Sequence, residues 1–137
     1  MNQLPNIIVS STDLQRLDAL IQARKGPDSP GLQSLKDELA RATIVEPRDV
    51  PATVVTMNST VRFAMEPTGR EFELTLVYPK DVDGESNTIS VLAPVGSALL
   101  GLSVGQEIAW PMPRGRTVTV RILEVTYQPE RAGNLVH

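Results

Sequence analysis

The stretch EFELTLVY at residues 71–78 alternates polar and apolar side chains. Its aromatic and aliphatic residues fall on one side of an extended chain, and this period of two is typical of a β-strand with one buried face. A turn sequence, PTGR at residues 67–70, comes directly before it, and a β-prone apolar run precedes the turn. That run contains Val54, Val55, Val61 and Phe63. The stretch therefore predicts a strand in the middle of a β-rich unit.

The residues after this strand predict the rest of an antiparallel sheet. A polar loop at residues 81–85 is followed by a buried strand at 89–92, and Pro94 suits the first turn of a short helix over 94–102. Two further strands follow, at residues 108–110 and 118–125, joined by a turn at 113–116. The predicted class is α+β, an antiparallel sheet with one short helix.

The N-terminal part of the chain has a helical period instead. Leu14, Leu17 and Ile21 recur at spacings of three and four, which places one apolar stripe on a helix of about three turns. The segment GPDSPG at residues 26–31 is a turn, because it holds two glycines and two prolines. A second apolar stripe follows the turn, formed by Leu32, Leu35, Leu39 and Ala42. Two short helices with matching stripes predict a short antiparallel coiled-coil hairpin.

The domain boundary is predicted at the segment EPRDVP, residues 46–51. Its two prolines end the second helix, because the residue before a proline is pushed out of the helical region. We therefore expect a helical domain over residues 1–46 and a β-rich domain over residues 47–137.

The composition excludes several classes of function. The chain has 137 residues, a net charge of −3 and no cysteine, and its single histidine is His137. A balanced charge argues against direct gripping of nucleic-acid phosphates, and the lack of cysteine excludes disulfides and thiolate chemistry. The N-terminus has no positively charged leader region, and the longest uncharged stretch, residues 86–106, is broken by proline and glycine. We expect a cytoplasmic protein with no membrane contact.

Two loops resemble ligand-binding motifs but lack an essential residue. Residues 96–103 have the glycine spacing of a phosphate-binding loop, with Leu102 where a lysine would reach the phosphates. Residues 81–92 resemble part of a calcium loop, but the glycine is at the fourth position and Leu92 replaces the terminal glutamate. Neither loop predicts a bound ligand.

Charged pairs offer no catalytic arrangement either. Glu71 and Glu73 point the same way on a strand, where paired carboxylates are most often its solvated face. Arg114 and Arg116 flank a glycine at a hairpin tip, and both a solubilising turn and a contact with an acidic partner are open for them. The residues therefore predict a small binding protein that is not an enzyme and holds no cofactor and no metal.

The segment APVGSALLGL at residues 93–102 resembles part of the bacterial Gre transcript-cleavage factors, which reads Ser-Pro-hydrophobic-Ala-Arg-Ala-Leu-hydrophobic-Gly-Lys. Later segments resemble the same family in the same order along the chain. They are residues 104–107, Pro113 with Gly115, and the group Ile122, Val125 and Tyr127. The match is closer still to a Gre-like branch concerned with nucleoside diphosphate kinase. Three segments of this chain resemble the hallmarks of that branch: VVTMNS at 54–59, TLVYP at 75–79 and YQPE at 127–130.

The resemblance implies an FKBP-like fold for the β-rich domain and docking on the rim of the RNA polymerase secondary channel. The matching docking residues are Pro94, Val95, Gly96 and Ser97, with Ser97 in place of the arginine of the family. Gre factors insert a long hairpin whose tip carries paired acids that complete a magnesium site. Here the hairpin is short and its tip holds one acid, Asp28.

The resemblance and these departures predict a monomer that binds RNA polymerase and competes with Gre factors without stimulating transcript cleavage. The protein would contact DNA and RNA only indirectly, through the polymerase. Control of nucleoside diphosphate kinase, by direct contact or through its expression, is also implied. A prolyl isomerase is a further alternative that rests on the FKBP-like fold alone.

Overall fold

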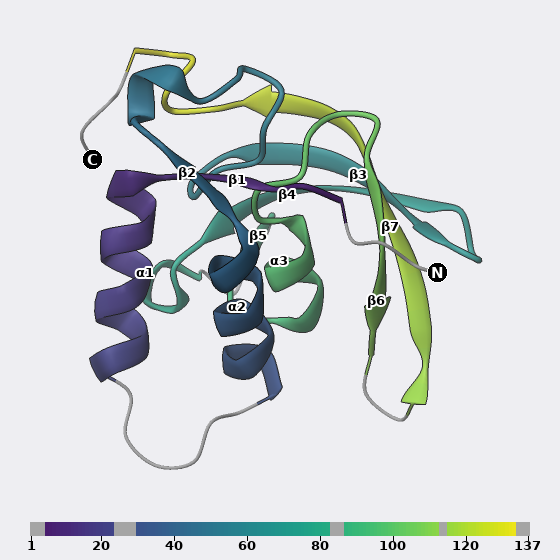
Figure 1. Cartoon of the computed structure of the whole chain (residues 1–137). Helices are drawn as coiled ribbons and strands as arrows, with labels where there is room; N and C mark the ends of the chain where they lie inside the picture. The colour runs from purple at the N-terminus through teal and green to yellow at the C-terminus, as the bar shows by residue number, and fades with distance from the viewer. Residues whose placement is uncertain (1–4, 24–29, 83–86, 113–114, 134–137) are drawn as a thin grey trace.

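A computed structural model describes residues 5–23, 30–82, 87–112 and 115–133 of the chain. Figure 1 shows a mixed α+β fold in which a curled sheet covers a short helix, α3, with two longer helices, α1 and α2, on the same side. Asp28, Arg114 and His137 lie outside the described residues. The α+β class predicted from the sequence is confirmed.

Five strands form the main sheet of the described chain, in the order β5-β4-β3-β7-β6. Their bounds are Thr60–Glu66 for β3, Arg70–Val77 for β4, Thr88–Ser90 for β5, Glu107–Pro111 for β6 and Thr117–Tyr127 for β7. Glu71 and Glu73 are exposed on β4 while Leu76 is fully buried, so the predicted alternation is confirmed. Of the β-prone run before the turn, Val61 and Phe63 lie in β3, whereas Val54 and Val55 lie in a loop that forms an isolated bridge between Val54 and Ser103.

The expectation of a purely antiparallel sheet is wrong at one edge. β3 is antiparallel to β4 and β7, and β6 is antiparallel to β7, but β5 runs parallel to β4. A parallel neighbour needs a crossing connection instead of a tight hairpin. The chain supplies it after Tyr78, beginning with the short 3-10 helix η2, Pro79–Asp81.

Helix α1 spans Ser11–Ala23 and α2 spans Pro30–Arg41, close to the predicted stripes. The residues that connect them lie outside the described ranges, and the coiled-coil pairing stays a prediction. The sequence did not predict two three-residue strands, β1 (Ile8–Ser10) and β2 (Thr43–Val45), which pair in parallel just before α1 and just after α2. A 3-10 turn, η1 (Pro47–Asp49), then leads into the β-rich part. No helix of the described ranges is long and apolar enough to cross a membrane.

Helix α3 spans Pro94–Leu99, three residues shorter than predicted. It ends early because Gly101 adopts a φ of 83°, a left-handed conformation that stops a helix and that glycine accepts most readily. A Cβ atom at Gly101 would lie 2.7 Å from Cβ of Ile7, so β1 could not approach as closely with any other residue there. The amide of Ile8 also donates to the Gly101 carbonyl at 3.2 Å.

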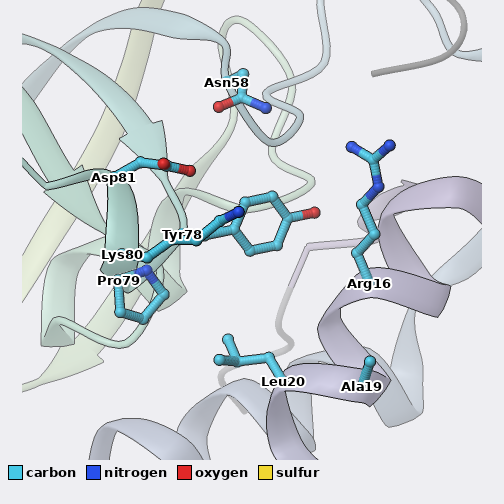
Figure 2. Close-up of a pocket in the computed structure, with 8 residues that line it drawn as sticks. All are labelled: Arg16, Ala19, Leu20, Asn58, Tyr78, Pro79, Lys80 and Asp81. Atoms are coloured by element: carbon cyan, nitrogen blue, oxygen red, sulfur yellow. The ribbon is translucent and has the colours of Figure 1, made fainter.

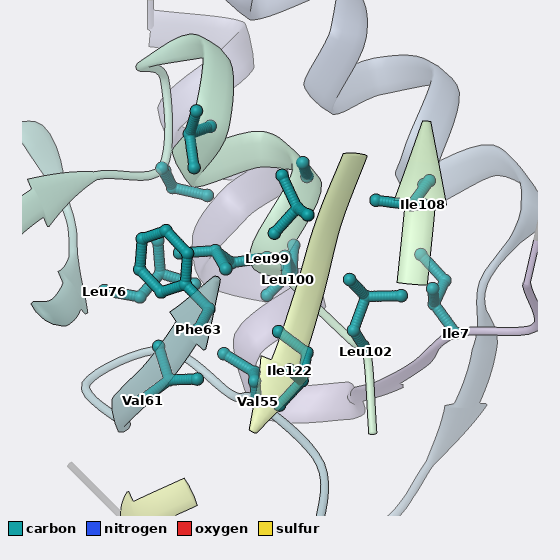
Figure 3. Close-up of a cluster of buried hydrophobic side chains, with 14 of the residues drawn as sticks. Ile7, Val55, Val61, Phe63, Leu76, Leu99, Leu100, Leu102, Ile108 and Ile122 are labelled. Atoms are coloured by element: carbon teal, nitrogen blue, oxygen red, sulfur yellow. The ribbon is translucent and has the colours of Figure 1, made fainter. Parts of the chain in front are cut away.

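One apolar core joins all these elements. Figure 3 shows Phe63 and Ile122 from the sheet packed around Leu99 of α3 and Leu100, the residue directly after it. Leu17 of α1 and Leu35 of α2 belong to the same buried cluster. The helices therefore share the core of the sheet, and the division into domains at residues 46 and 47 stays a proposal.

Candidate functional site

The predicted docking residues form the first turn of α3. Pro94 occupies the first helical position and is exposed, whereas Val95, Gly96 and Ser97 are buried. A Cβ atom on Gly96 would lie 1.9 Å from the carbonyl oxygen of Ser90, so this position admits only glycine without movement of the backbone. The hydroxyl of Ser97 donates to the carbonyl oxygen of Val91 at 2.8 Å.

Gly96 and Ser97 therefore hold the turn against the end of β5 and the residue after it, and Val95 is buried, so none of the three offers a side chain to solvent. Pro94 is the exposed member, and the half-buried Leu92 and Ala93 lie directly before it. Gly96 and Ser97 shape the segment that would meet a partner. The docking role of the four residues stays a prediction.

Two of the sequence hallmarks, residues 54–59 and 127–130, meet in the structure. The hydroxyl of Thr56 donates to Oε1 of Glu130 at 2.8 Å and lies 2.7 Å from the hydroxyl of Ser59. Nε2 of Gln128 donates to the Val54 carbonyl at 2.7 Å and to the carbonyl of Pro51 at 2.8 Å. These buried polar groups tie the end of β7 to the loop before β3. The polar side chains of segments 54–59 and 127–130 therefore have a structural role, which is to bond these two segments together.

The same loop also receives the first turn of α1. Asp13 is fully buried, and its Oδ2 accepts a hydrogen bond from the backbone amide of Met57 at 3.1 Å. The backbone amide of Asp13 donates to the hydroxyl of Ser10 at 3.0 Å, a capping contact at the start of the helix. Asp13 therefore fixes the beginning of α1 relative to the β-rich part.

A second polar contact lies at the end of α2. Glu38 is nearly fully buried and receives two hydrogen bonds from Arg41, at 2.6 and 3.1 Å. Arg41 also donates to the backbone carbonyl of Pro5, which ties the N-terminal segment to this helix. Burial raises the pKa of the Glu38 carboxyl, while the guanidinium of Arg41 opposes that shift.

The outer face of the sheet, opposite the core, is charged. Arg62 on β3 forms ion pairs with Glu124 on β7 at 3.2 Å and with Glu71 on β4 at 3.5 Å. Arg121 pairs with Glu107 at 2.9 Å on the neighbouring strands. All five side chains are exposed, so this part of the outer face is charged and solvated.

No site for a metal is seen in the described part of the chain, where no three acidic or histidine side chains gather. Asp81 of the calcium-like segment is exposed on η2, while its neighbour Asp83 lies outside the described residues. Arg116 is exposed at the base of the β6–β7 hairpin, where its carbonyl accepts from the amide of Met112 at 2.7 Å. Both interpretations of Arg116, a solubilising turn and a contact with an acidic partner, stay open.

Comparison with protein families matches both parts of this fold. Residues 50–127 match the family described as transcription elongation factor, GreA/GreB, C-term, which places the β-rich part in the class of Gre factors. Residues 5–45 match the family described as Rnk N-terminus. The two matches together span the helices, the sheet and α3.

Individual relatives refine this class. The regulator of nucleoside diphosphate kinase of Escherichia coli is 42% identical over 130 residues, which cover 95% of this chain and 96% of that protein. The chain therefore belongs to the family of regulators of nucleoside diphosphate kinase, a branch of the Gre factors.

Two further relatives carry the Gre name. The elongation factor GreA of Thermodesulfovibrio yellowstonii is 31% identical over 97 residues, covering 71% of this chain and 61% of that one. A solved structure, the prokaryotic transcription elongation factor GreA/GreB from Nitrosomonas europaea, is 57% identical with a TM-score of 0.70, covering 90% of this chain and 99% of that one. These relatives are named as regulators or transcription factors and not as catalysts.

Proposed function

We propose that this protein binds RNA polymerase near its secondary channel and competes there with Gre factors without stimulating transcript cleavage. The observation that carries the proposal is the match of residues 50–127 to the C-terminal part of GreA and GreB, joined to helices far too short for a long insertion. With 13 and 12 residues, α1 and α2 are each only about 20 Å long. The proposal includes an FKBP-like β-rich domain and a cytoplasmic location.

The exposed surface before α3 supports docking at this point. Leu92, Ala93 and Pro94 present apolar atoms on a turn that Gly96 and Ser97 hold rigidly against β5. A fixed apolar turn costs little conformational entropy when it binds. The charged outer face of the sheet, around Arg62, offers no comparable surface.

The experiment is a competition measurement with purified polymerase and a fluorescently labelled Gre factor. The full chain is expected to displace the labelled factor. Pro94→Asp is expected to weaken displacement at least about tenfold, because a charge would replace an apolar contact at the centre of the interface. Pro94 is the suitable position because Val95 is buried, and a charge there would disturb the fold instead.

The matched control is Arg62→Asp, a charge change on the outer face of the sheet. It is expected to leave displacement within about twofold of the native chain. A native chain that does not displace the Gre factor would overturn the proposal. Equal displacement by Pro94→Asp and the native protein would remove the turn before α3 from it.

A second candidate, direct binding of nucleoside diphosphate kinase, is favoured by the name of the relative from Escherichia coli. An equilibrium binding measurement with the purified kinase, in the absence of polymerase, tests it. A saturable complex supports direct contact. Its absence, together with changed kinase levels in cells that lack the protein, supports control through transcription.

A further inference from the structure

A pocket opens between α1 and the corner where β4 leads into η2. Its cavity of about 690 Å³ is lined from both sides, by residues of the helix and by residues of the β-rich part. Figure 2 shows the lining residues, which are Arg16, Ala19, Leu20, Asn58, Tyr78, Pro79, Lys80 and Asp81. A cavity of this volume is in the range that small-molecule sites occupy.

The lower wall of the pocket is apolar. Leu20 and Ala19 of α1 lie across from Pro79 of η2 (Figure 2). The ring of Tyr78 lies above these residues. This wall suits the apolar body of a ligand.

The upper wall carries polar and charged groups. Arg16 extends from α1 toward the Tyr78 hydroxyl, and Lys80 and Asp81 extend from η2 (Figure 2). Lys80 forms no ion pair within the described part of the chain. Among the described residues that line the pocket, two cations stand against one carboxylate, and this excess of positive charge favours an anionic group.

Tyr78 and Asn58 add fixed polar groups to this wall. Burial and the negative charge of Asp13 raise the pKa of the Tyr78 phenol, an effect that Arg16 opposes, so the phenol stays neutral at physiological pH. Asn58 holds a φ of 67°, and its amide donates to the Leu76 carbonyl at 2.6 Å, which fixes the position of its backbone. The carboxylate of Asp13 is fully buried, accepts from the Met57 amide and is not among the residues that line the pocket, so its charge reaches Tyr78 without offering an oxygen to a ligand.

We propose that this pocket binds a small organic anion, with its phosphate or carboxylate head between Arg16 and Lys80 and its apolar body against Leu20 and Pro79. The carboxamide of Asn58 would complete the contacts with the head. A free small molecule is the occupant, since the polar groups converge on a volume of small-molecule size. The ligand would bridge α1 and the β-rich part, and would thereby fix their relative position. This inference goes beyond polymerase binding and does not depend on it.

The test is a titration of the full chain, labelled with ¹⁵N, followed by NMR. The probes are phenyl phosphate, benzoate and inorganic phosphate. The expected result is saturable shifts for phenyl phosphate or benzoate, centred on Arg16, Tyr78 and Lys80, with weaker binding of inorganic phosphate because it lacks the apolar body. Tighter binding of phenyl phosphate would identify a phosphate site, and tighter binding of benzoate would identify a carboxylate site.

Variants separate this site from a general attraction of anions. Arg16→Ala and Lys80→Ala are each expected to weaken binding at least about tenfold, which corresponds to about 1.4 kcal/mol. The matched control Arg48→Ala removes an exposed cation from η1, outside the pocket, and should leave binding unchanged. Lys80 is exposed, so its removal should not disturb the fold.

Two results would overturn the inference. One is the absence of saturable shifts for any probe up to roughly 10 mM, which would mean a standard binding free energy weaker than about −3 kcal/mol. The other is equal weakening by Arg48→Ala and by Lys80→Ala. Neither result bears on polymerase binding, because no polymerase is present.

Discussion

The helical part and the β-rich part of this protein are held together in different ways. In the β-rich part, β3 pairs with β4 over six residue pairs and with β7 over seven, the latter with two register shifts, so long ladders define the sheet. In the helical part, two short helices are flanked by strands of three residues each. Helices of this length gain most of their stability from tertiary contacts. The sheet therefore supplies the frame of the core, and the helices depend on their contacts with it.

The largest expected effect tests whether the turn of α3 is fixed by the sheet. Gly96→Ala would place a Cβ atom 1.9 Å from the backbone oxygen of Ser90, so we expect a loss of more than about 4 kcal/mol or failure to fold. The control is Gly105→Ala, where no atom lies within 4 Å and only the φ of 88° is unfavourable. It should cost about 1 kcal/mol. Equal midpoints of the two variants in urea unfolding would refute the tight fit of α3.

The next effect tests the dependence of α1 on the common core. Leu17 is fully buried, so Leu17→Ala is expected to cost about 2–5 kcal/mol in the free energy of unfolding. Leu20→Ala, on the half-buried side of the same helix, should cost clearly less. Both are measured by urea denaturation monitored at Trp110. A similar loss of unfolding free energy in both variants would mean that the burial of Leu17 in the core does not stabilise α1 more than the half-buried Leu20 does.

A smaller effect tests the polar contact that positions α1. Asp13→Ala removes the acceptor of the buried Met57 amide, and a buried donor without a partner costs about 1–3 kcal/mol. Asp18→Ala, on the exposed side of the same helix, should change stability by less than about 0.5 kcal/mol. Hydrogen exchange at the Met57 amide should accelerate in Asp13→Ala alone. Unchanged protection there would show that this contact does not join the two parts.

The junction between the two parts also predicts a pH dependence. Because the pKa of Tyr78 is raised above its usual value of 10.0, the folded state keeps the phenolic proton at pH values where the unfolded state has lost it. The stability contributed by this group is complete below pH 10 and declines as the pH rises further. Denaturant unfolding between pH 9 and 11 should show this decline, and Tyr78→Phe should reduce it. The same slope in both proteins would assign the decline to other groups.

The smallest effect is expected on the outer face of the sheet. Arg62→Ala removes two ion pairs, but its side chain is 44% exposed and such pairs are worth about 0–1 kcal/mol. The unfolding midpoint should therefore move little, and less still in high salt. A large loss would mean that these charges support the sheet as strongly as its core does.

The sequence predicted the elements whose pattern repeats over several residues. The alternation in residues 71–78 identified β4, and the leucine spacing around Leu17 and Leu35 identified α1 and α2. It did not identify β1 and β2, because three residues carry no readable period. The strand predicted as buried at residues 89–92 is β5, which covers only Thr88–Ser90 and is half-buried, and its parallel direction was missed because three residues carry no signal of strand direction.

The candidate site was predictable only in part. The segment that begins at Pro94 was recognised as a unit, but small residues such as Gly96 and Ser97 give no hydrophobic signal of burial. The contact between Thr56 and Glu130 joins residues 74 positions apart, a separation at which no local pattern predicts contact. The pocket near Arg16 was likewise not predicted, because its walls come from α1, the loop at Asn58 and η2.

The central claim is that the Gre-related β-rich part binds polymerase while the short helices supply no cleavage activity. The most direct measurement follows transcript cleavage in stalled elongation complexes, with the protein added alone and then in increasing amounts to a fixed amount of a Gre factor. We predict no cleavage above background with the protein alone and a dose-dependent loss of the cleavage that the Gre factor stimulates. Stimulation of cleavage by the protein itself, or undiminished activity of the Gre factor at saturating protein, would contradict the account.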